Sequence, residues 1–481
     1  MRSSRRPPPL APNMRAQYRV GALMQAVATA SAALFRGGTS RAPRATTLRM
    51  AQVDTGGLGA PDICVLGGGF GGLYTALRLS KLDWGDAPRP RVTLVDRQER
   101  FVFLPMLYEV ATGSASCWEV APPFTEVLAG SGVEFVRGTV AGLDAESRMV
   151  RVTTGGDDGG GEAVAERLLP YDACVLALGA RATGYAGVPG AEAHSRQFYT
   201  LDDALALRKE LQALRLKRKG GQLRVAIVGN GYIGTELSAN LASWLGPQSL
   251  SLTLVGSGDE VLGSGRAFNR GVAQKDLDAK GIHVVLNTRV ASVDERGLML
   301  QPKAASAEAY RLETDLVVWC AGSAPTPLAG AATPPLPLSA DGRILTEPTL
   351  AVRGAPRLFA LGDGAACERA APGLAPTPST AQAAMQQADY AAWNVRAALR
   401  DERNKMMPFR YADLGEMLSL GDSAGAMSSL GLINLQGPLA NLGRRAVYAA
   451  RMPTSQQAVR AGLSWAVDSV VGAMRRGGAK G

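Results

Sequence analysis

Glycines with the spacing of a phosphate-binding loop follow an early apolar run. The motif Gly67-x-Gly69-x-x-Gly72 directly follows residues 62–66, which are expected to form a strand, and a helix is expected over 73–81. The first glycine of such a loop makes a tight turn, the second lets backbone N–H groups approach a pyrophosphate, and the third lets helix and strand pack closely. The N-terminus of the helix then faces the phosphates.

An acidic residue at the expected position completes this unit. The next strand, residues 91–96, ends at Asp96, which lies 24 residues after Gly72. A carboxylate there can accept hydrogen bonds from ribose hydroxyls. Strand, glycine loop, helix, strand and acid together predict a dinucleotide site.

The same unit recurs in the middle of the chain. An expected strand over 223–228 precedes a second glycine loop, a helix over 235–244 and a strand over 249–255. The glycines of the second loop are Gly229, Gly231 and Gly234. Two copies of this strand, glycine loop, helix and strand in one chain argue against accidental matches, and the sequence therefore predicts two dinucleotide sites.

Side chains that do chemistry without a cofactor are scarce. The chain has two histidines, His194 and His283, and its cysteines show no close pairing. The cysteines are Cys64, Cys117, Cys174, Cys320 and Cys367. We expect no disulfide framework and no metal site, so that the chemistry must come from a bound cofactor.

Further segments carry a resemblance to a known family. They are residues 171–180, 315–322, 358–363 and 381–387. With both glycine loops, they resemble the type II NAD(P)H:quinone dehydrogenases, flavoproteins of the pyridine-nucleotide disulfide reductase fold. The similarity spans residues 60–481. It implies FAD at the first loop, a nicotinamide cofactor at the second and a quinone as electron acceptor.

The resemblance also implies roles for single residues. Gly179 ends the strand that returns beneath the FAD, Gly322 ends the equivalent strand of the nicotinamide domain, and Asp363 contacts the ribityl and phosphate region of the flavin. Gln382 and Gln386, four apart on a helix beside the flavin, share one face and can hydrogen-bond the quinone oxygens. The alternative is that both are solvated helix residues.

Glu236 is the third expected catalytic residue. An acid stands at this position in the family, near the flavin and quinone pocket. The resemblance implies that nicotinamide passes a hydride to the flavin, and that quinone then takes two electrons and two protons. The alternative is that Glu236 only favours the first turn of its helix by its charge.

Within this family, the chain most resembles the C-type enzymes of plant and algal plastids. The segments that carry this likeness are residues 103–113, 414–421 and Trp393 with Asn394. The likeness implies a chloroplast enzyme that uses NADPH and a prenylated quinone, of the plastoquinone or demethylphylloquinone type.

The loop after residue 255 bears on the choice of nicotinamide cofactor. Gly256-Ser257-Gly258 has no carboxylate, and its absence relieves repulsion against a 2′-phosphate. Ser257 can donate to that phosphate, and Arg266 or Arg270 can pair with it. The alternative is a short loop with solvated arginines. We expect NADPH, with NADH not excluded.

Positive charge is concentrated at the two ends of the chain. Residues 1–53 hold nine arginines and no acid, as is typical of an organellar transit peptide, and the rest has 43 basic and 42 acidic residues. We expect no nucleic-acid partner, because the body of the chain is nearly neutral. The composition of this segment suits import into either plastid or mitochondrion, and the family resemblance implies the chloroplast, with the mitochondrion as second choice. A disordered basic tail is the alternative for this segment.

Residues 443–481 carry seven basic residues and one acid around an apolar stripe with helical spacing, beside Trp465. The stripe consists of Val459, Leu463, Val467, Val470, Val471 and Met474. A basic amphipathic helix is typical of attachment to a membrane or lipid-droplet surface. The alternatives are packing on the domain and a homodimer contact.

The predicted fold is α/β, with two Rossmann-like domains and a C-terminal membrane-associating region. The FAD domain is expected at 60–200 and 335–400, the NAD(P)H domain between them at 220–330, and the C-terminal region at 401–481. Two other functions stay open. One is a flavin-bound signalling or scaffold protein, and the other is a sulfide:quinone reductase-like enzyme using Cys117 and Cys367.

Overall fold

The structure is a computed structural model that describes residues 59–155, 165–185, 187–218, 220–421, 424–429 and 431–465. The expected transit peptide, residues 1–53, lies outside these ranges. So do the last residues of the C-terminal stripe, from Val467 to Met474.

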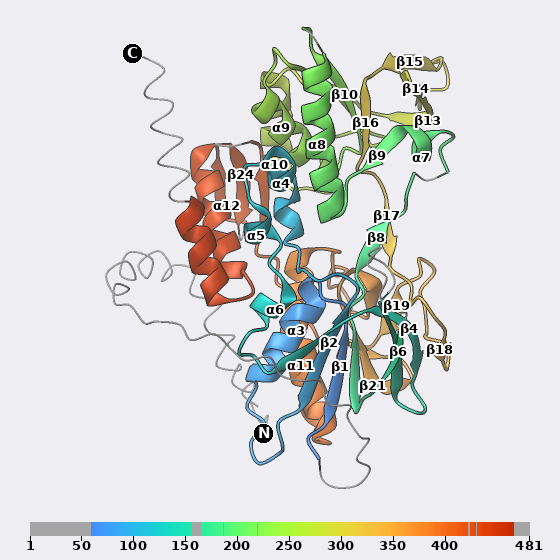
Figure 1. Ribbon diagram of the computed structural model, residues 1–481, viewed down its shortest axis with the longest axis vertical. Helices are drawn as coiled ribbons and strands as arrows, with labels where there is room; N and C mark the ends of the chain where they lie inside the picture. Colours follow the sequence, from blue (N-terminus) through green and yellow to red (C-terminus); the bar gives the residue numbers. More distant parts are fainter. Residues whose placement is uncertain are drawn as a thin grey trace, which may run out of the picture. The chain divides into compact units, whose positions relative to one another are not determined.

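An eight-stranded sheet carries the first glycine loop. Its strand order is β22-β19-β20-β21-β7-β1-β2-β3. In chain order these are β1 Asp62–Leu66, β2 Arg91–Asp96, β3 Val133–Arg137, β7 Ala173–Leu176, β19 Ile344–Thr346, β20 Ala351–Val352, β21 Ala355–Ala360 and β22 Ala365–Cys367. Because β1 is parallel to both β7 and β2, its apolar residues are buried between neighbours. Helices α3 (Phe70–Lys81) and α11 (Ala381–Leu399) pack side by side against this sheet (Figure 1).

A five-stranded parallel sheet carries the second glycine loop. Its order is β12-β11-β10-β16-β9, made of β9 Ser195–Gln197, β10 Leu223–Val228, β11 Leu250–Val255, β12 His283–Val285 and β16 Leu316–Trp319. The helices of this part are α7 Ala191–His194, α8 Leu201–Lys217, α9 Tyr232–Leu245 and α10 Ala267–Ala279. The strands of the first sheet come from both sides of this segment in the sequence. The edge strand β9 belongs to the second sheet, although the expected first domain ran to residue 200.

The strands expected next to both glycine loops are confirmed, and α/β is the fold class. Both loop helices begin three residues earlier than expected, at Phe70 and Tyr232. The reason is that the second glycine of each loop, Gly69 or Gly231, is itself the N-cap. The third glycine of each loop therefore lies within its helix.

Smaller sheets flank the two large ones. The order β18-β4-β5-β6 joins β4 Thr139–Asp144, β5 Met149–Thr154, β6 Ala165–Pro170 and β18 Ala332–Thr333. The order β13-β14-β15 joins β13 Thr288–Asp294, β14 Gly297–Pro302 and β15 Tyr310–Glu313. Strands β8 (Ala180–Ala182) and β17 (Ser323–Pro325) pair where the chain passes between the large sheets.

The last part of the chain adds a hairpin sheet and a helix. This sheet is β23 Glu416–Ser419, β24 Gly425–Ser429 and β25 Ile433–Gln436, followed by α12 Pro438–Arg451. Residues 455–465 are helical as well. The remaining short helices are η2 Leu104–Met106, α4 Leu107–Thr112, α5 Cys117–Val120, α6 Phe124–Val127, η3 Gly362–Gly364 and η4 Arg403–Lys405. Across the described ranges, no helix combines the length and apolar character that crossing a membrane requires.

Candidate functional site

Both glycine loops have the backbone conformation that their spacing predicts. Gly67 has φ +102° and Gly229 has φ +122°, values that residues other than glycine rarely adopt. A Cβ on Gly72 would overlap the carbonyl oxygen of Gly67, and one on Gly234 would overlap that of Gly229. The first and third glycines therefore permit the turn and the close packing of each helix on its strand.

The helices that follow these loops begin without a capping side chain. Gly69 and Gly231 are the N-caps of α3 and α9, and neither helix has an acidic residue in its first turn. In contrast, α8 and α11 are capped by the hydroxyls of Thr200 and Thr380. The first backbone N–H groups of α3 and α9 therefore stay available to an anion, as a pyrophosphate requires. Space is open beside both N-cap glycines, since a Cβ there would meet no atom within 4 Å.

Asp96 ends β2 beside the first loop. Its Oδ2 accepts a hydrogen bond from Gly68 N (2.5 Å), and its Oδ1 accepts one from Gln98 N (2.7 Å). Burial raises the pKa of this carboxyl, although the two N–H groups oppose that effect. Each oxygen keeps a further lone pair with which it can accept from a ribose hydroxyl.

Gly179 and Asp363 come together at the end of the first sheet. Gly179 has φ +68°, and a Cβ on Gly364 would lie 3.2 Å from its carbonyl oxygen, so that turn η3 is adjacent to it. Gly362 N donates to Gln387 Oε1 (2.8 Å) and ties η3 to α11. Burial raises the pKa of Asp363. An FAD bound at the first loop can thus meet polar groups of this turn.

Gly322 lies at the second crossing between the large sheets. It has φ +85°, and a Cβ there would overlap Thr183 Oγ1. Close contact between the two crossing segments therefore requires a glycine at this position.

Gln382 and Gln386 share one face of α11, as expected, and both bind the segment 411–415. Gln382 Oε1 accepts from Leu414 N (2.9 Å), and its Nε2 donates to Gly415 O (3.0 Å). Gln386 makes two bonds with the backbone of Ala412, at 2.9 and 2.8 Å. These bonds hold the start of the C-terminal region against α11. Hydrogen bonding to a quinone stays a prediction for both glutamines.

Glu236 is buried at the junction of three elements. It lies on α9, its Oε1 accepts from Tyr108 Oη (3.2 Å) on α4, and the same atom accepts from Ser419 N (2.9 Å) on β23. Burial raises the pKa of Glu236 to about 7, against the opposing effects of the Ser419 N–H and the Arg444 charge. Its place beyond the first turn and these contacts exclude a role limited to charging that turn.

A buried ion pair extends this cluster into α12. Arg444 Nη2 lies 2.7 Å from Glu109 Oε1, and both side chains are almost completely buried. Arg444 Nη1 also donates to Tyr108 Oη (3.3 Å), which in turn donates to Glu236. Although burial by itself lowers the pKa of Arg444, the Glu109 carboxylate raises it overall. Tyr448 stacks against the guanidinium at 5.3 Å.

Sequence reasoning named Glu236 but missed the other residues of this cluster. Tyr108 and Glu109 lie in the segment 103–113 that carries the family resemblance, but they were given no role. Arg444 was counted among the charges of a membrane-binding stretch, yet it is buried. Burial of a long charged residue depends on partners 335 positions away, which no local pattern shows.

Of the residues expected at the adenosine end of the second site, the serine is exposed and the two arginines already form ion pairs. Ser257 is exposed just after β11. Arg266 pairs with Asp413 (2.5 Å), and Arg270 pairs with Glu260 (3.3 Å). Both arginines therefore already have carboxylate partners, and a 2′-phosphate would have to compete for them.

Cysteine chemistry has little support in this structure. Cys117 and Cys367 are free thiols on α5 and β22, and burial raises the pKa of Cys367 to about 11. A reactive cysteine needs a lowered pKa instead. In the described ranges no group of three or more His, Cys, Asp or Glu side chains could hold a metal ion.

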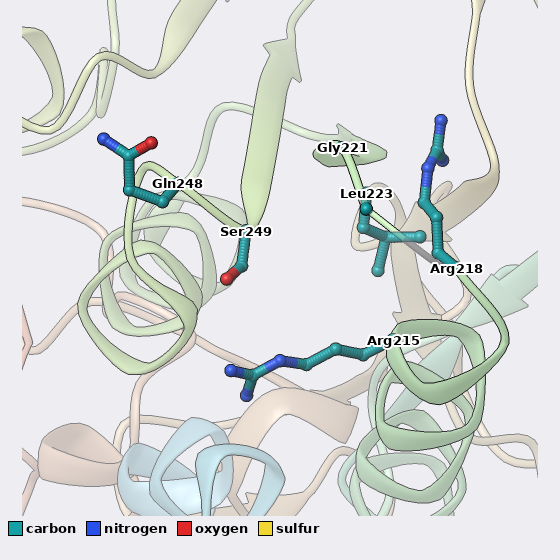
Figure 2. A pocket seen from close by; sticks show the side chains of 7 residues that line it. Arg215, Arg218, Gly221, Leu223, Gln248 and Ser249 are labelled. Carbon is teal, nitrogen blue, oxygen red and sulfur yellow. The ribbon is translucent and has the colours of Figure 1, made fainter.

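A hollow of about 260 Å³ lies at the end of the second sheet that is opposite its glycine loop (Figure 2). It is lined by Leu223 and Ser249, where β10 and β11 begin, and Arg215 reaches into it from α8. Ligands of open parallel sheets bind at the carboxyl ends of the strands. This hollow is therefore not part of the dinucleotide site.

Comparison with known proteins agrees with this geometry. Residues 61–388 match the family model described as pyridine nucleotide-disulphide oxidoreductase. A demethylphylloquinone reductase of Synechocystis sp. is 41% identical over 84% of this chain and 95% of its own. The chloroplastic/mitochondrial alternative NAD(P)H-ubiquinone oxidoreductase C1 of Arabidopsis thaliana is 37% identical over 85% of this chain and 82% of its own.

A solved structure shares the fold. NDH2 from Plasmodium falciparum in complex with NADH has a TM-score of 0.73 at 18% identity, covering 84% of this chain and 97% of that one.

Proposed function

The chain belongs to the pyridine nucleotide-disulphide oxidoreductases, in their branch of type II NAD(P)H:quinone oxidoreductases, and we propose that it reduces a prenylated quinone with NADPH. It is an enzyme with FAD and NAD(P)H as cofactors. One observation carries the proposed assignment of residues. Glu236 projects from α9, the helix of the second glycine loop, into a buried contact with Tyr108 of α4 and with Ser419 of β23 in the C-terminal region.

The residues present fit both cofactors. The uncapped N-termini of α3 and α9 would hold the two pyrophosphates, and Asp96 would hold the adenosine ribose of FAD. Asp363 and Gly179 would lie along the ribityl chain. When bound, FAD supplies the redox chemistry by accepting a hydride from the nicotinamide and passing two electrons to the quinone.

The chain's own residues supply position and a proton. Reduction of a quinone consumes protons. Glu236 has a pKa of about 7, and its carboxyl group accepts a hydrogen bond from Tyr108. We assign Glu236 the delivery of a proton to the bound quinone. Gln382 and Gln386 hold the segment 411–415 against α11, and an amide that bonds a quinone oxygen would exchange one of these backbone bonds for it.

The acceptor class follows from the relatives. One is named for demethylphylloquinone and the other for ubiquinone, both of which are quinones with a prenyl tail. We propose an acceptor of the plastoquinone or demethylphylloquinone type. A plastid membrane or plastoglobule surface is the location that this acceptor favours, with the mitochondrion as second choice.

Access to such an apolar substrate needs contact with a lipid phase. Leu432 and Leu442 are 87% and 66% exposed, and Ile433 and Leu439 are exposed as well. We name these four residues, at the β24–β25 turn and the start of α12, the apolar tip. We propose that it docks on the membrane, with a homodimer contact as the other use of this surface.

Of the four basic residues of 443–481 that lie within the described ranges, three face acidic residues. Arg444 and Arg445 face Glu109, and Arg460 pairs with Glu126. Trp465, which lies beside the stripe, is buried beneath Arg445. Leu463 and Val459 stay exposed on the same helix.

Stopped-flow measurement of the bound flavin tests this function. We expect NADPH to bleach the flavin absorbance and a prenylated naphthoquinone or benzoquinone to restore it within the turnover time. NADH is compared in parallel. Bleaching without reoxidation by any quinone would contradict the proposal and favour a flavoprotein with a signalling or scaffold role.

A further inference from the structure

Gly256 directly follows β11, and its own backbone conformation does not require a glycine. Gly256 N donates to Val285 O (2.8 Å), and Gly256 O accepts from Thr288 N (3.0 Å). Its φ lies outside the left-handed region, and a residue with a side chain can adopt this conformation. The backbone at position 256 therefore permits the carboxylate with which other dinucleotide folds bind a ribose.

Asn230, the second residue of the nicotinamide glycine loop, takes up the space instead. A Cβ on Gly256 would lie 2.5 Å from both Cβ and Oδ1 of Asn230. A Cβ cannot swing aside as the end of a flexible side chain can. Asn230 Nδ2 also donates to Glu260 O (2.6 Å), which fixes the amide over Gly256 and Gly258. Asn230 and a side chain at 256 are thus mutually exclusive.

We propose that Asn230 determines the coenzyme choice of the second site by keeping the end of β11 free of a carboxylate. This inference rests on the proposed nicotinamide site. An acid at this position binds the adenosine ribose hydroxyls and repels a 2′-phosphate. With Asn230 in place, the 2′-phosphate of NADPH meets no such charge.

The second site accepts NADPH because no carboxylate repels the 2′-phosphate, and not because an arginine is reserved for that phosphate. Arg266 and Arg270 are held by Asp413 and Glu260. The side-chain donor that the loop 256–258 offers is the hydroxyl of exposed Ser257. The site consequently tolerates NADH as well, and a single acid at position 256 would convert it to NADH alone once Asn230 is removed.

Calorimetric binding of 2′,5′-ADP and ADP-ribose to the FAD-loaded protein tests this exclusion without turnover. In N230G/G256E, we expect 2′,5′-ADP affinity to fall about tenfold or more, since like charges would be placed together, while ADP-ribose still binds. In the matched neutral variant N230G/G256Q, both ligands should bind. In N230A/G256E, both should be lost, because alanine keeps the obstructing Cβ. Flavin content and melting temperature report whether each variant is folded.

Two results would overturn the inference. One is N230A/G256E binding as well as N230G/G256E, which would show that Asn230 excludes nothing. The other is N230G/G256E binding 2′,5′-ADP as tightly as the wild type. If the wild type binds neither ligand, the second loop is not a nicotinamide site, and the proposed function fails with the inference.

Discussion

Glu236 combines burial with two hydrogen-bond donors, and burial raises its pKa to about 7. Its carboxyl is protonated below that pH and loses the proton above it. If it delivers the proton, flavin reoxidation by quinone should slow as pH rises above 7, while flavin reduction by NADPH should not. We expect Glu236→Gln to slow reoxidation by about 10² and to remove this pH dependence. Stopped-flow traces from pH 5.5 to 9 measure both steps. An unchanged pH profile in the variant would assign the proton to another group.

The same raised pKa makes a prediction about stability. The ordinary pKa of a glutamate is 4.5, and the folded value is near 7. The folded state therefore disfavours the charged form, and stability falls as pH rises through this window. Relative to wild type, Glu236→Gln should gain up to about 3 kcal/mol between pH 4.5 and 7, and nothing further above that. Apparent melting temperatures of both proteins across this range give the difference. A constant difference would show that Glu236 is charged throughout.

Arg444 and Glu109 form a charge pair that water hardly reaches. Removing one partner leaves the other charge buried without compensation, at a cost of about 3–5 kcal/mol. We expect Arg444→Met to lower the melting temperature by about 3–6 °C, and Arg444→Met/Glu109→Leu to recover most of that loss. Arg343→Met, at an exposed pair with Asp341, is the matched control and should change little. If the double variant is as unstable as the single one, the pair is not what stabilises α12.

At the scale of the element, the third glycine of the first loop fixes how closely α3 approaches β1. A Cβ on Gly72 would overlap the Gly67 carbonyl, whereas one on Gly69 would enter open space. Gly72→Ala should therefore disturb the fold of the flavin-free protein, while Gly69→Ala should fold normally. Both should retain about tenfold less FAD, since Gly69 borders the expected pyrophosphate. Flavin content and the melting temperature of the flavin-free form separate the two effects. Full flavin retention in Gly69→Ala would place the pyrophosphate elsewhere.

Local elements were predictable from the sequence because their signals are local. Strands at 62–66, 91–96 and 223–228 follow from apolar runs that end at a glycine loop, and the structure has all three. The environment of Arg444 was not predictable, because its partner Glu109 comes from a distant helix. Asn230 was overlooked for the same reason. It is an unremarkable loop residue until β11 places Gly256 against it.

Across the described molecule, the C-terminal region contributes buried residues to the candidate site and exposed apolar residues to the surface. Strand β23 binds Glu236 through Ser419 N, and α12 supplies Arg444 to the buried pair. Residues 455–465 pack on α5 and α6, where Gln457 donates to Trp118 O (2.8 Å). A segment that had been expected mainly as a membrane attachment is therefore also part of the folded core around the candidate site.

The outer side of this region leads to a prediction about substrate access. Leu432, Leu439 and Leu442 of the apolar tip are exposed beside an otherwise well-packed region. If they enter a lipid phase, replacing all three by serine should weaken vesicle binding on the order of 100-fold, since each leucine loses part of about 2 kcal/mol of burial. Turnover of a long-chain prenylquinone in vesicles should fall accordingly, and that of a short-chain soluble quinone should not. Leu216→Ser, at an 86% exposed position on α8, is the control and should bind vesicles like the wild type. Equal loss for both quinones would instead mean that the leucines support the fold of α12, because a docking surface affects only the substrate that must be drawn from the lipid.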